Sequence, residues 1–368
     1  MAEPRAKSTG LLIAQILAQS WRESPPPLEC SAEDLTGIAP LLLGSGAAAL
    51  AWWRIRHSEL RSSPEALQLQ NAYHHFTLES DLHERDIKQV FSLFYTAGVE
   101  PLLVKGWASA RLYPEPGMRV YGDIDLCVRP EQQEAALAVI KGPECKHYNL
   151  DLVYDELNRL GNRSFDELSA RSQRFTLDEV EVRIPGPEDH LRIQCLHLLK
   201  HGAWRPLWLC DIAAAVENRP ADFDWDLCLG KDSRKADWIA CTIGLAHQLL
   251  GAHVEDTPVA GRAKRLPGWL IPAVLKQWEK PCAADHHPPE LMLATLRHRT
   301  GLLRAIRGRW PDPIQATIWM GGSFNELPRL PFQLRYFQAQ AMRFLARLPG
   351  ALGKEHDSGK ESSSLCVF

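Results

Sequence analysis

Hydrophobic residues recur every three or four positions along most of the chain, the spacing that places them on one face of a helix. This pattern predicts helices in the N-terminal region and over most of the chain after Pro187. The predicted helical segments are residues 11–17, 41–56, 64–97, 107–112, 131–141, 187–202, 206–216, 225–229, 235–250, 269–277, 291–307 and 334–348. Proline and glycine mark several of their ends, because proline lacks a backbone donor and glycine readily adopts the left-handed conformation that closes a helix.

Between residues 99 and 184 the pattern changes to short runs of β-branched and apolar residues. These runs predict strands that alternate with shorter helical segments. The predicted strands are 99–104, 123–128, 147–154 and 180–184, the last paired with the segment around Phe175. Strands with helices between them, together with one hairpin, predict an α+β fold with an α/β core.

These changes divide the chain into four predicted parts. A helical N-terminal region (1–85) precedes a sheet-containing core (86–186), a helical C-terminal domain (187–349) and a tail (350–368). The tail is rich in serine, glycine, lysine and glutamate, a composition typical of disordered segments.

The predicted strand over residues 123–128 carries two carboxylates, Asp123 and Asp125, separated by one aliphatic residue. Side chains at positions i and i+2 of a strand leave the same face, so both should point into one small space. Two like charges repel each other there unless a cation is present or one carboxyl is protonated. Because hard oxygen ligands favour Mg²⁺ or Mn²⁺, we predict that the pair binds one of these ions.

A Lys105-Gly106 step directly follows the preceding predicted strand. Gly106 would let the backbone approach a phosphate closely, and Lys105 would supply a mobile positive charge for the β or γ phosphate. Ser109 could contact phosphate if the turn continues into a helix. Arg119 could hold phosphate through two hydrogen bonds, or pair with an acid such as Glu115. Metal ligands beside such a turn indicate phosphoryl or nucleotidyl transfer.

The ordered set Lys105-Gly106, Tyr113, Gly117-x-Arg119 and Asp123-x-Asp125 resembles the uncharacterised nucleotidyltransferase family of the polymerase-beta-like superfamily. The resemblance covers roughly residues 85–215. It implies that residues 86–186 form the nucleotidyltransferase sheet domain, with helices before and after it. It also implies that two metal ions assist transfer of a nucleoside monophosphate, with a third carboxylate from a later strand. Lys-Gly stands where other members of the superfamily have Gly-Ser.

Asp151 is the natural candidate for the third carboxylate, because it lies on the next predicted strand between apolar neighbours. In the family this strand resembles a Val-Asp-Leu-His run, which aligns Asp151 with the carboxylate and Val153 with the histidine. Asp155 and Glu156 remain alternatives, since a shift of one residue reverses the face of a strand. The predicted roles of the third carboxylate are metal ligand and general base toward the acceptor hydroxyl.

The predicted helix from Pro187 carries four polar side chains along one side: His190, Gln194, His197 and His201. His197 and His201 have the spacing of a metal-binding helix, but no glutamate stands between them, which excludes the metalloprotease motif. The resemblance implies that this helix lies beside the active site. We predict that Lys200 and His197 bind the triphosphate, although core packing of the histidines is an equal alternative. Asp211, on the next predicted helix, is predicted to anchor the two helices through a buried polar contact.

Composition excludes several other classes of protein. The chain is 45% hydrophobic and 24% charged, with a net charge of −3, so it has no general attraction to nucleic acid or to an anionic membrane. Its nine cysteines lack Cys-x-x-Cys pairs, which argues against a zinc site or a disulfide framework. No apolar run is long enough for a signal peptide or a membrane span. These features predict a cytoplasmic protein without membrane partners.

The expected activity is therefore Mg²⁺-dependent transfer of a nucleoside monophosphate from an NTP to an acceptor. The weakly acidic chain favours a small molecule, a peptide or a protein over long nucleic acid as the acceptor. One alternative is a metal-dependent glycosyltransferase that uses Asp-x-Asp, although it would need a nucleotide-binding sheet before the motif, where the pattern is helical. The other is an inactive nucleotide-binding regulatory module. An inactive protein could easily have lost one of its catalytic residues. The chain retains all four candidates: Lys105, Asp123, Asp125 and Asp151.

Overall fold

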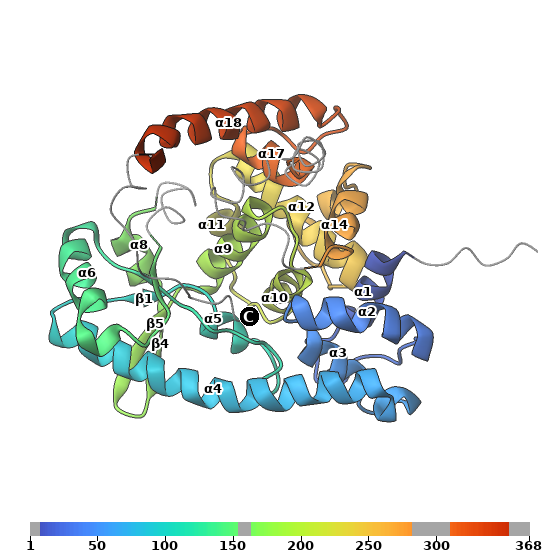
Figure 1. The fold of residues 1–368 in the computed structure, drawn as a ribbon, viewed down its shortest axis with the longest axis horizontal. Helices are drawn as coiled ribbons and strands as arrows, with labels where there is room; N and C mark the ends of the chain where they lie inside the picture. Colours follow the sequence, from blue (N-terminus) through green and yellow to red (C-terminus); the bar gives the residue numbers. More distant parts are fainter. Residues whose placement is uncertain (1–7, 154–162, 282–309, 353–368) are drawn as a thin grey trace, which may run out of the picture.

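Three short strands form the sheet that carries the acidic pair. β1 (Leu102–Leu103) pairs antiparallel with β2 (Ile124–Cys127), and β2 pairs parallel with β3 (Leu150–Leu152). A separate antiparallel hairpin consists of β4 (Gln173–Leu177) and β5 (Val180–Ile184). These elements come from a computed structural model, which describes residues 8–153, 163–281 and 310–352. The fold is α+β, as predicted, and the β4–β5 hairpin extends past α4 at the edge of the molecule (Figure 1).

The two faces of the three-stranded sheet pack against different helices. Leu103, Ile124 and Leu126 share one buried cluster with the aromatic residues of α4 (Pro64–Thr96). Leu102, Val104 and Cys127 leave the opposite face and pack with Leu168 of α8 (Phe165–Ala170) and Ile193 of α9 (Pro187–Lys200). Because side chains alternate along a strand, Asp125 shares this second face with Cys127. The acidic pair thus faces the helices that follow the sheet.

The long helix α4 runs along one edge of the molecule (Figure 1). It begins where the Ser63 side chain accepts a hydrogen bond from the Ala66 backbone, and it continues without interruption for 33 residues. Gly98 follows with a φ of +71°, the left-handed conformation expected after a helix. The helix therefore crosses residue 85, where the first domain boundary was predicted. The four-part division of the chain stays a prediction.

The largest hydrophobic core joins the beginning of the chain to its later helices. Leu17 of α1 (Thr9–Leu17), Leu35 of α2 (Ala32–Gly44) and Leu50 of α3 (Ala48–Ile55) lie in the same core as the later helices. The remaining helices are α5 (Trp107–Ala110), α6 (Gln133–Lys141), α10 (Pro206–Glu217), α11 (Trp225–Leu229), α12 (Ser233–Leu250), α13 (Ala260–Ala263), α14 (Leu270–Trp278), α17 (Pro313–Trp319) and α18 (Leu330–Leu352). Short 3₁₀ helices span Glu59–Ser62, Pro130–Gln132 and Pro143–Cys145.

Several boundaries differ from the sequence-based predictions. The helix predicted over 41–56 is two helices, because Gly46 adopts a φ of +73° and the Arg205 guanidinium occupies the space beside it. β1, β2 and β3 are shorter than predicted, whereas β5 has the predicted bounds. Most of α2, which begins at Ala32, was missed, as were the short helices α8, α13 and α17. The predicted helix over 291–307 lies outside the described residues, as does the tail after Leu352. Of the helices described, none is long and apolar enough to span a membrane.

Candidate active site

The strand register brings two of the three predicted carboxylates together. Asp125 on β2 stands directly opposite Asp151 on the parallel strand β3, so their side chains leave the same face of the sheet. Asp125 is only 4% exposed, whereas Asp151 and Asp123 are exposed. Asp123 directly precedes β2, two positions before Asp125. Asp155 and Glu156, the alternatives to Asp151, lie outside the described residues.

Lys105 forms an ion pair with the buried carboxylate. Its Nζ lies 3.3 Å from Oδ1 of Asp125, and the two side chains are 16% and 5% exposed. The pairing follows from the antiparallel register, because the Val104 backbone N–H donates to the Asp125 carbonyl at 3.0 Å and Lys105 comes next. A cation next to Asp125 offsets the cost of burying its negative charge.

Gly106 is required by the turn after Lys105. Its φ of +57° and ψ of −104° are strained for any residue with a Cβ. A Cβ there would also lie 3.3 Å from the Asp123 carbonyl oxygen. The following residue, Trp107, is buried and donates from Nε1 to Glu84 of α4 at 2.8 Å. The Lys105-Gly106 turn is thus held against the backbone that leads into β2.

Arg119 is bound by Asp211 of α10. Its NH2 lies 2.7 Å from Oδ2 of Asp211, and its Nε donates to Oδ1 at 3.2 Å. The Tyr113 hydroxyl donates to the same Oδ1 at 2.8 Å, and all three side chains are buried. Burial lowers the pKa of Arg119, but attraction and hydrogen bonding to Asp211 outweigh it and raise the pKa. Burial, together with the nearby Asp211 charge, raises the pKa of Tyr113 well above its ordinary value.

Of the two alternatives predicted for Arg119, the structure shows pairing with an acid, and a phosphate role stays a prediction. The acid that pairs with Arg119 is Asp211, 92 positions away, and not Glu115. This pairing uses the Nε and NH2 edge of the guanidinium, and NH1 donates to the Val120 carbonyl at 2.8 Å. Asp211 makes a buried polar contact, as predicted, but the contact joins α10 to the segment before β2, whereas the prediction was that it anchors α9 and α10.

A second buried polar cluster joins α5 to α9. Gln194 Nε2 donates to the Ser109 hydroxyl at 3.0 Å, and His190 Nε2 lies 3.4 Å from the same oxygen. Ser109 is 2% exposed and contacts α9 in this structure, and its phosphate role stays a prediction. Burial lowers the pKa of His190 to about 4, which keeps the imidazole neutral at pH 7. The sequence placed His190 and Gln194 on one side of α9 but did not identify Ser109 as their partner.

The low pKa of His190 predicts a specific pH dependence of stability. An unfolded histidine has a pKa of about 6.5, so the unfolded chain takes up a proton as the pH falls toward 4 while folded His190 does not. The free energy of unfolding should therefore decrease as the pH falls from about 6.5 to about 4. The expected decrease from this histidine is up to about 3 kcal/mol. Urea unfolding at several pH values should show a smaller loss in His190→Gln than in the wild type. Equal losses would contradict the neutral buried imidazole.

His197 and Lys200 lie in the last turns of α9, beyond the residues that contact α5. The His197 ring packs edge-on against Trp208 with centroids 4.5 Å apart, and it also contacts His201 at 4.6 Å. Gln315 of α17 donates to the Lys200 carbonyl at 3.3 Å. At a rise of about 1.5 Å per residue, Lys200 lies about 15 Å farther along α9 than His190. The aromatic packing agrees with the alternative for His197, and a phosphate role for either residue stays a prediction.

The carboxylates near β2 have the donor chemistry of a site for a hard divalent cation. Asp123, Asp125 and Asp151 would supply oxygen ligands of the type that Mg²⁺ and Mn²⁺ prefer. Within the described ranges, however, no three histidine, cysteine, aspartate or glutamate side chains lie close enough to share an ion. Instead, Lys105 is the cation beside Asp125. The donor set therefore fits the metal chemically, and binding would require the Asp125–Lys105 pair to separate.

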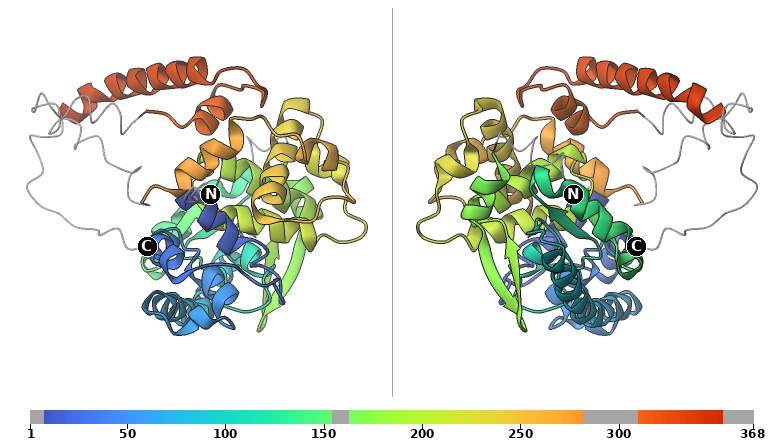
Figure 2. Two further views of the ribbon diagram at one scale, coloured as in Figure 1. Left: turned by 90° about the vertical axis from the view of Figure 1, so that its right-hand side faces the viewer. Right: turned by 90° about the vertical axis from the view of Figure 1, so that its left-hand side faces the viewer.

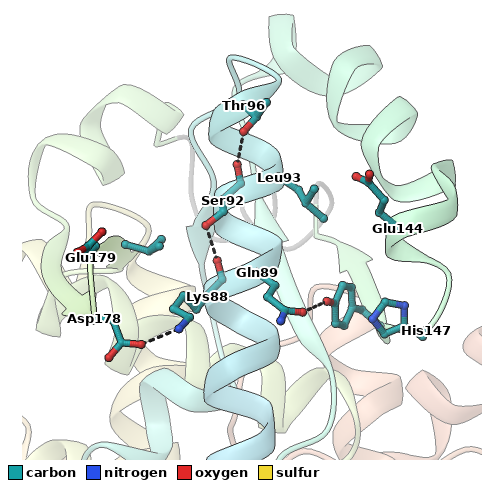
Figure 3. Close-up of a pocket in the computed structure, with 11 residues that line it drawn as sticks. Lys88, Gln89, Ser92, Leu93, Thr96, Glu144, His147, Asp178 and Glu179 are labelled. Carbon is teal, nitrogen blue, oxygen red and sulfur yellow. Dashed lines mark hydrogen bonds and ion pairs between the residues drawn. The ribbon is translucent and has the colours of Figure 1, made fainter.

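A surface cavity of about 780 Å³ lies elsewhere on the sheet domain (Figure 3). It follows the outer side of α4, between the segment before β3 and the turn that joins β4 to β5. Its rim carries the carboxylates of Glu144, Asp178 and Glu179, and Lys88 pairs with Asp178 at 2.6 Å. The lining includes none of the candidate active-site residues. The cavity is thus distinct from the Asp125 site.

Comparison with known proteins identifies the family of the chain. A family model described as an uncharacterised nucleotidyltransferase matches residues 38–251. The match extends from α2 to the end of α12, so it includes the sheet, the Lys105-Gly106 turn and both buried polar clusters. No curated protein and no solved structure shows a significant match. Because the model covers more than half of the chain, this protein belongs to the uncharacterised nucleotidyltransferase family.

Proposed function

We propose that this protein is a Mg²⁺-dependent enzyme that transfers a nucleoside monophosphate from an NTP to an acceptor. The observation that carries the proposal is the register of β2 and β3, which puts Asp125 opposite Asp151 and beside the Lys105-Gly106 turn. Family membership supports nucleotidyl transfer in general. The acceptor we propose is a hydroxyl or phosphate group on a small molecule, a peptide or a protein.

Asp123, Asp125 and Asp151 are the proposed metal ligands. A bound divalent ion would neutralise charge on the triphosphate and would lower the pKa of an attacking hydroxyl. Asp151, exposed at the edge of the sheet, is placed to accept the proton of the acceptor hydroxyl. The backbone of Asp125 is held in place by the pairing of β2 with both neighbouring strands.

Lys105 has two alternative partners in this proposal. Without substrate it pairs with Asp125, and with substrate it would turn toward the β or γ phosphate. The exchange avoids an unpaired charge, because ligation of a metal by Asp125 would replace the interaction that Lys105 gives up. Gly106, which lacks a side chain, would leave the backbone of the turn accessible to the same phosphates.

The role of Lys105 predicts a change in substrate binding. Lys105→Gln should raise the Michaelis constant for NTP about tenfold or more, equivalent to about 1.4 kcal/mol, because one phosphate contact is lost. The Michaelis constant for the acceptor should change little. Lys88→Gln is the matched control, since Lys88 also pairs with an aspartate but lines the separate cavity. Equal constants in Lys105→Gln and the wild type would contradict the role. Lys200→Gln in the same assay tests the role predicted for Lys200 from the sequence.

The activity can be tested without knowing the acceptor. The protein would be incubated with α-labelled ATP, CTP, GTP or UTP and Mg²⁺, with and without a pool of small molecules and peptides. We expect Mg²⁺-dependent pyrophosphate release and transfer of label with at least one NTP. If the protein binds NTP but releases no pyrophosphate under any of these conditions, the inactive regulatory module is correct and the transferase is not. Transfer from a nucleotide sugar instead would support the glycosyltransferase.

A further inference from the structure

The overall charge of −3 hides an uneven distribution along the chain. Residues 291–352 contain nine arginines, no lysine and only two acidic residues, a net charge of +7. The rest of the chain contains 33 basic and 43 acidic residues, a net charge of −10. The helix α18 lies at the end of the cationic segment and contains three arginines and no acidic residue. Such asymmetry is typical of proteins that bind a polyanionic surface.

The helix α18 also exposes large apolar side chains. Leu330 and Leu334 are one turn apart, with exposed fractions of 53% and 43%, and Met342 is 67% exposed two turns farther on. Leu327, just before the helix, is 62% exposed. Arg335 is exposed beside Leu334. In its described part, the helix therefore presents apolar side chains and a guanidinium to solvent.

The other side of α18 attaches the helix to the body of the protein. Tyr336 is 6% exposed and stacks on Trp319 of α17 with centroids 6.1 Å apart. Gln333 Nε2 donates to the Pro311 carbonyl at 2.7 Å. Both ribbon views place α18 at the outer edge of the molecule, over α17 (Figures 1 and 2). The exposed leucines are thus on a fixed surface that faces away from the core.

Charge and apolar exposure together select one class of partner. Two copies of α18 packed on each other would bring like charges together, and a nucleic acid would bind the arginines but leave the leucines in water. An anionic lipid surface satisfies both, because apolar side chains enter the acyl boundary while arginines contact the headgroups. We propose that α18 docks the protein on an anionic membrane surface. This proposal is independent of the nucleotidyl transfer proposed above.

Vesicle sedimentation tests the proposal with the full-length protein. We expect binding to phosphatidylcholine vesicles that contain about 30% phosphatidylglycerol, little binding to phosphatidylcholine alone, and weaker binding as salt increases. Leu330→Glu with Leu334→Glu should reduce the affinity about tenfold or more, because two apolar contacts are lost and two like charges are added. Arg335→Gln should reduce it about fivefold.

A matched control uses an exposed leucine pair with the same spacing on α4. Leu78 and Leu82 are 67% and 55% exposed, but Glu79 and Asp81 lie beside them. Leu78→Glu with Leu82→Glu should leave vesicle binding unchanged. Three results would overturn the proposal: no binding to anionic vesicles at low salt, equal binding by the α18 variants and the wild type, or a dimer that the α18 variants dissociate without any vesicle binding. Binding of RNA or DNA that the leucine variants do not weaken would overturn it as well.

Discussion

Replacing Asp123 with asparagine is expected to lower the rate of nucleotidyl transfer about a thousandfold or more. The substitution removes one proposed metal ligand, and such a ligand contributes several kcal/mol to stabilising the transition state. A substitution at Asp123 tests activity with less effect on stability than one at Asp125. Asp123 is exposed, whereas Asp125 is buried and paired with Lys105. The free energy of unfolding of Asp123→Asn should be unchanged or higher, since repulsion between carboxylates is relieved.

Asp222 provides the control for this substitution, because it is also an exposed aspartate but lies between α10 and α11. Asp222→Asn should retain full activity. Steady-state kinetics at several Mg²⁺ concentrations, combined with urea unfolding, would compare the two variants. Full activity of Asp123→Asn would show that the Asp-x-Asp pair is not the metal site.

Removing the carboxylate of Asp211 is expected to destabilise the protein by about 3–5 kcal/mol. Asp211→Ala would leave the buried guanidinium of Arg119 without its counter-charge and the buried Tyr113 hydroxyl without an acceptor. The loss should be much larger than for an ion pair on the surface, because the side chains of Arg119 and Asp211 are only 7% and 3% exposed. Replacing both members, with Arg119→Met and Asp211→Leu, should recover part of the stability, since no buried charge remains.

The ion pair of Arg219 with Asp256 is the matched control for Asp211. Asp256 is 58% exposed, so Asp256→Ala should cost less than about 1 kcal/mol. Urea unfolding of the variants would measure both losses. A cost below about 1 kcal/mol for Asp211→Ala would contradict a buried, charge-dependent link between α10 and the segment that leads into β2.

The elements of the site that depend on local sequence were predictable. The run from Asp123 to Val128 has the residue types of a strand, and Pro187 marks the beginning of α9. Asp151 was chosen because it lies on the next predicted strand between apolar neighbours, and the observed register places it opposite Asp125. The family was also recognisable, because its motif residues lie within about twenty positions of one another.

The contacts between distant segments were not predictable in the same way. Arg119 and Asp211 are 92 positions apart, and Ser109 and His190 are 81 apart, so no local periodicity relates them. An arginine near a phosphate turn has the same local signature whether it binds phosphate or a buried aspartate. For this reason the sequence did not identify the partners that Arg119 and Ser109 have in the structure. Helix phase placed His190 and Gln194 correctly on one side of α9 but could not identify what that side contacts.

The central claim is that Asp123 and Asp125 bind a divalent ion together with an NTP. Electron paramagnetic resonance of Mn²⁺ tests it directly, because the signal of the free ion falls as the ion binds. With wild-type protein, addition of an NTP should tighten Mn²⁺ binding beyond that of the NTP alone, and Asp123→Asn should abolish this effect. Equal binding of Mn²⁺ and NTP by wild-type protein and Asp123→Asn would contradict the claim, as would NTP binding to the wild type that is equally tight without any divalent ion.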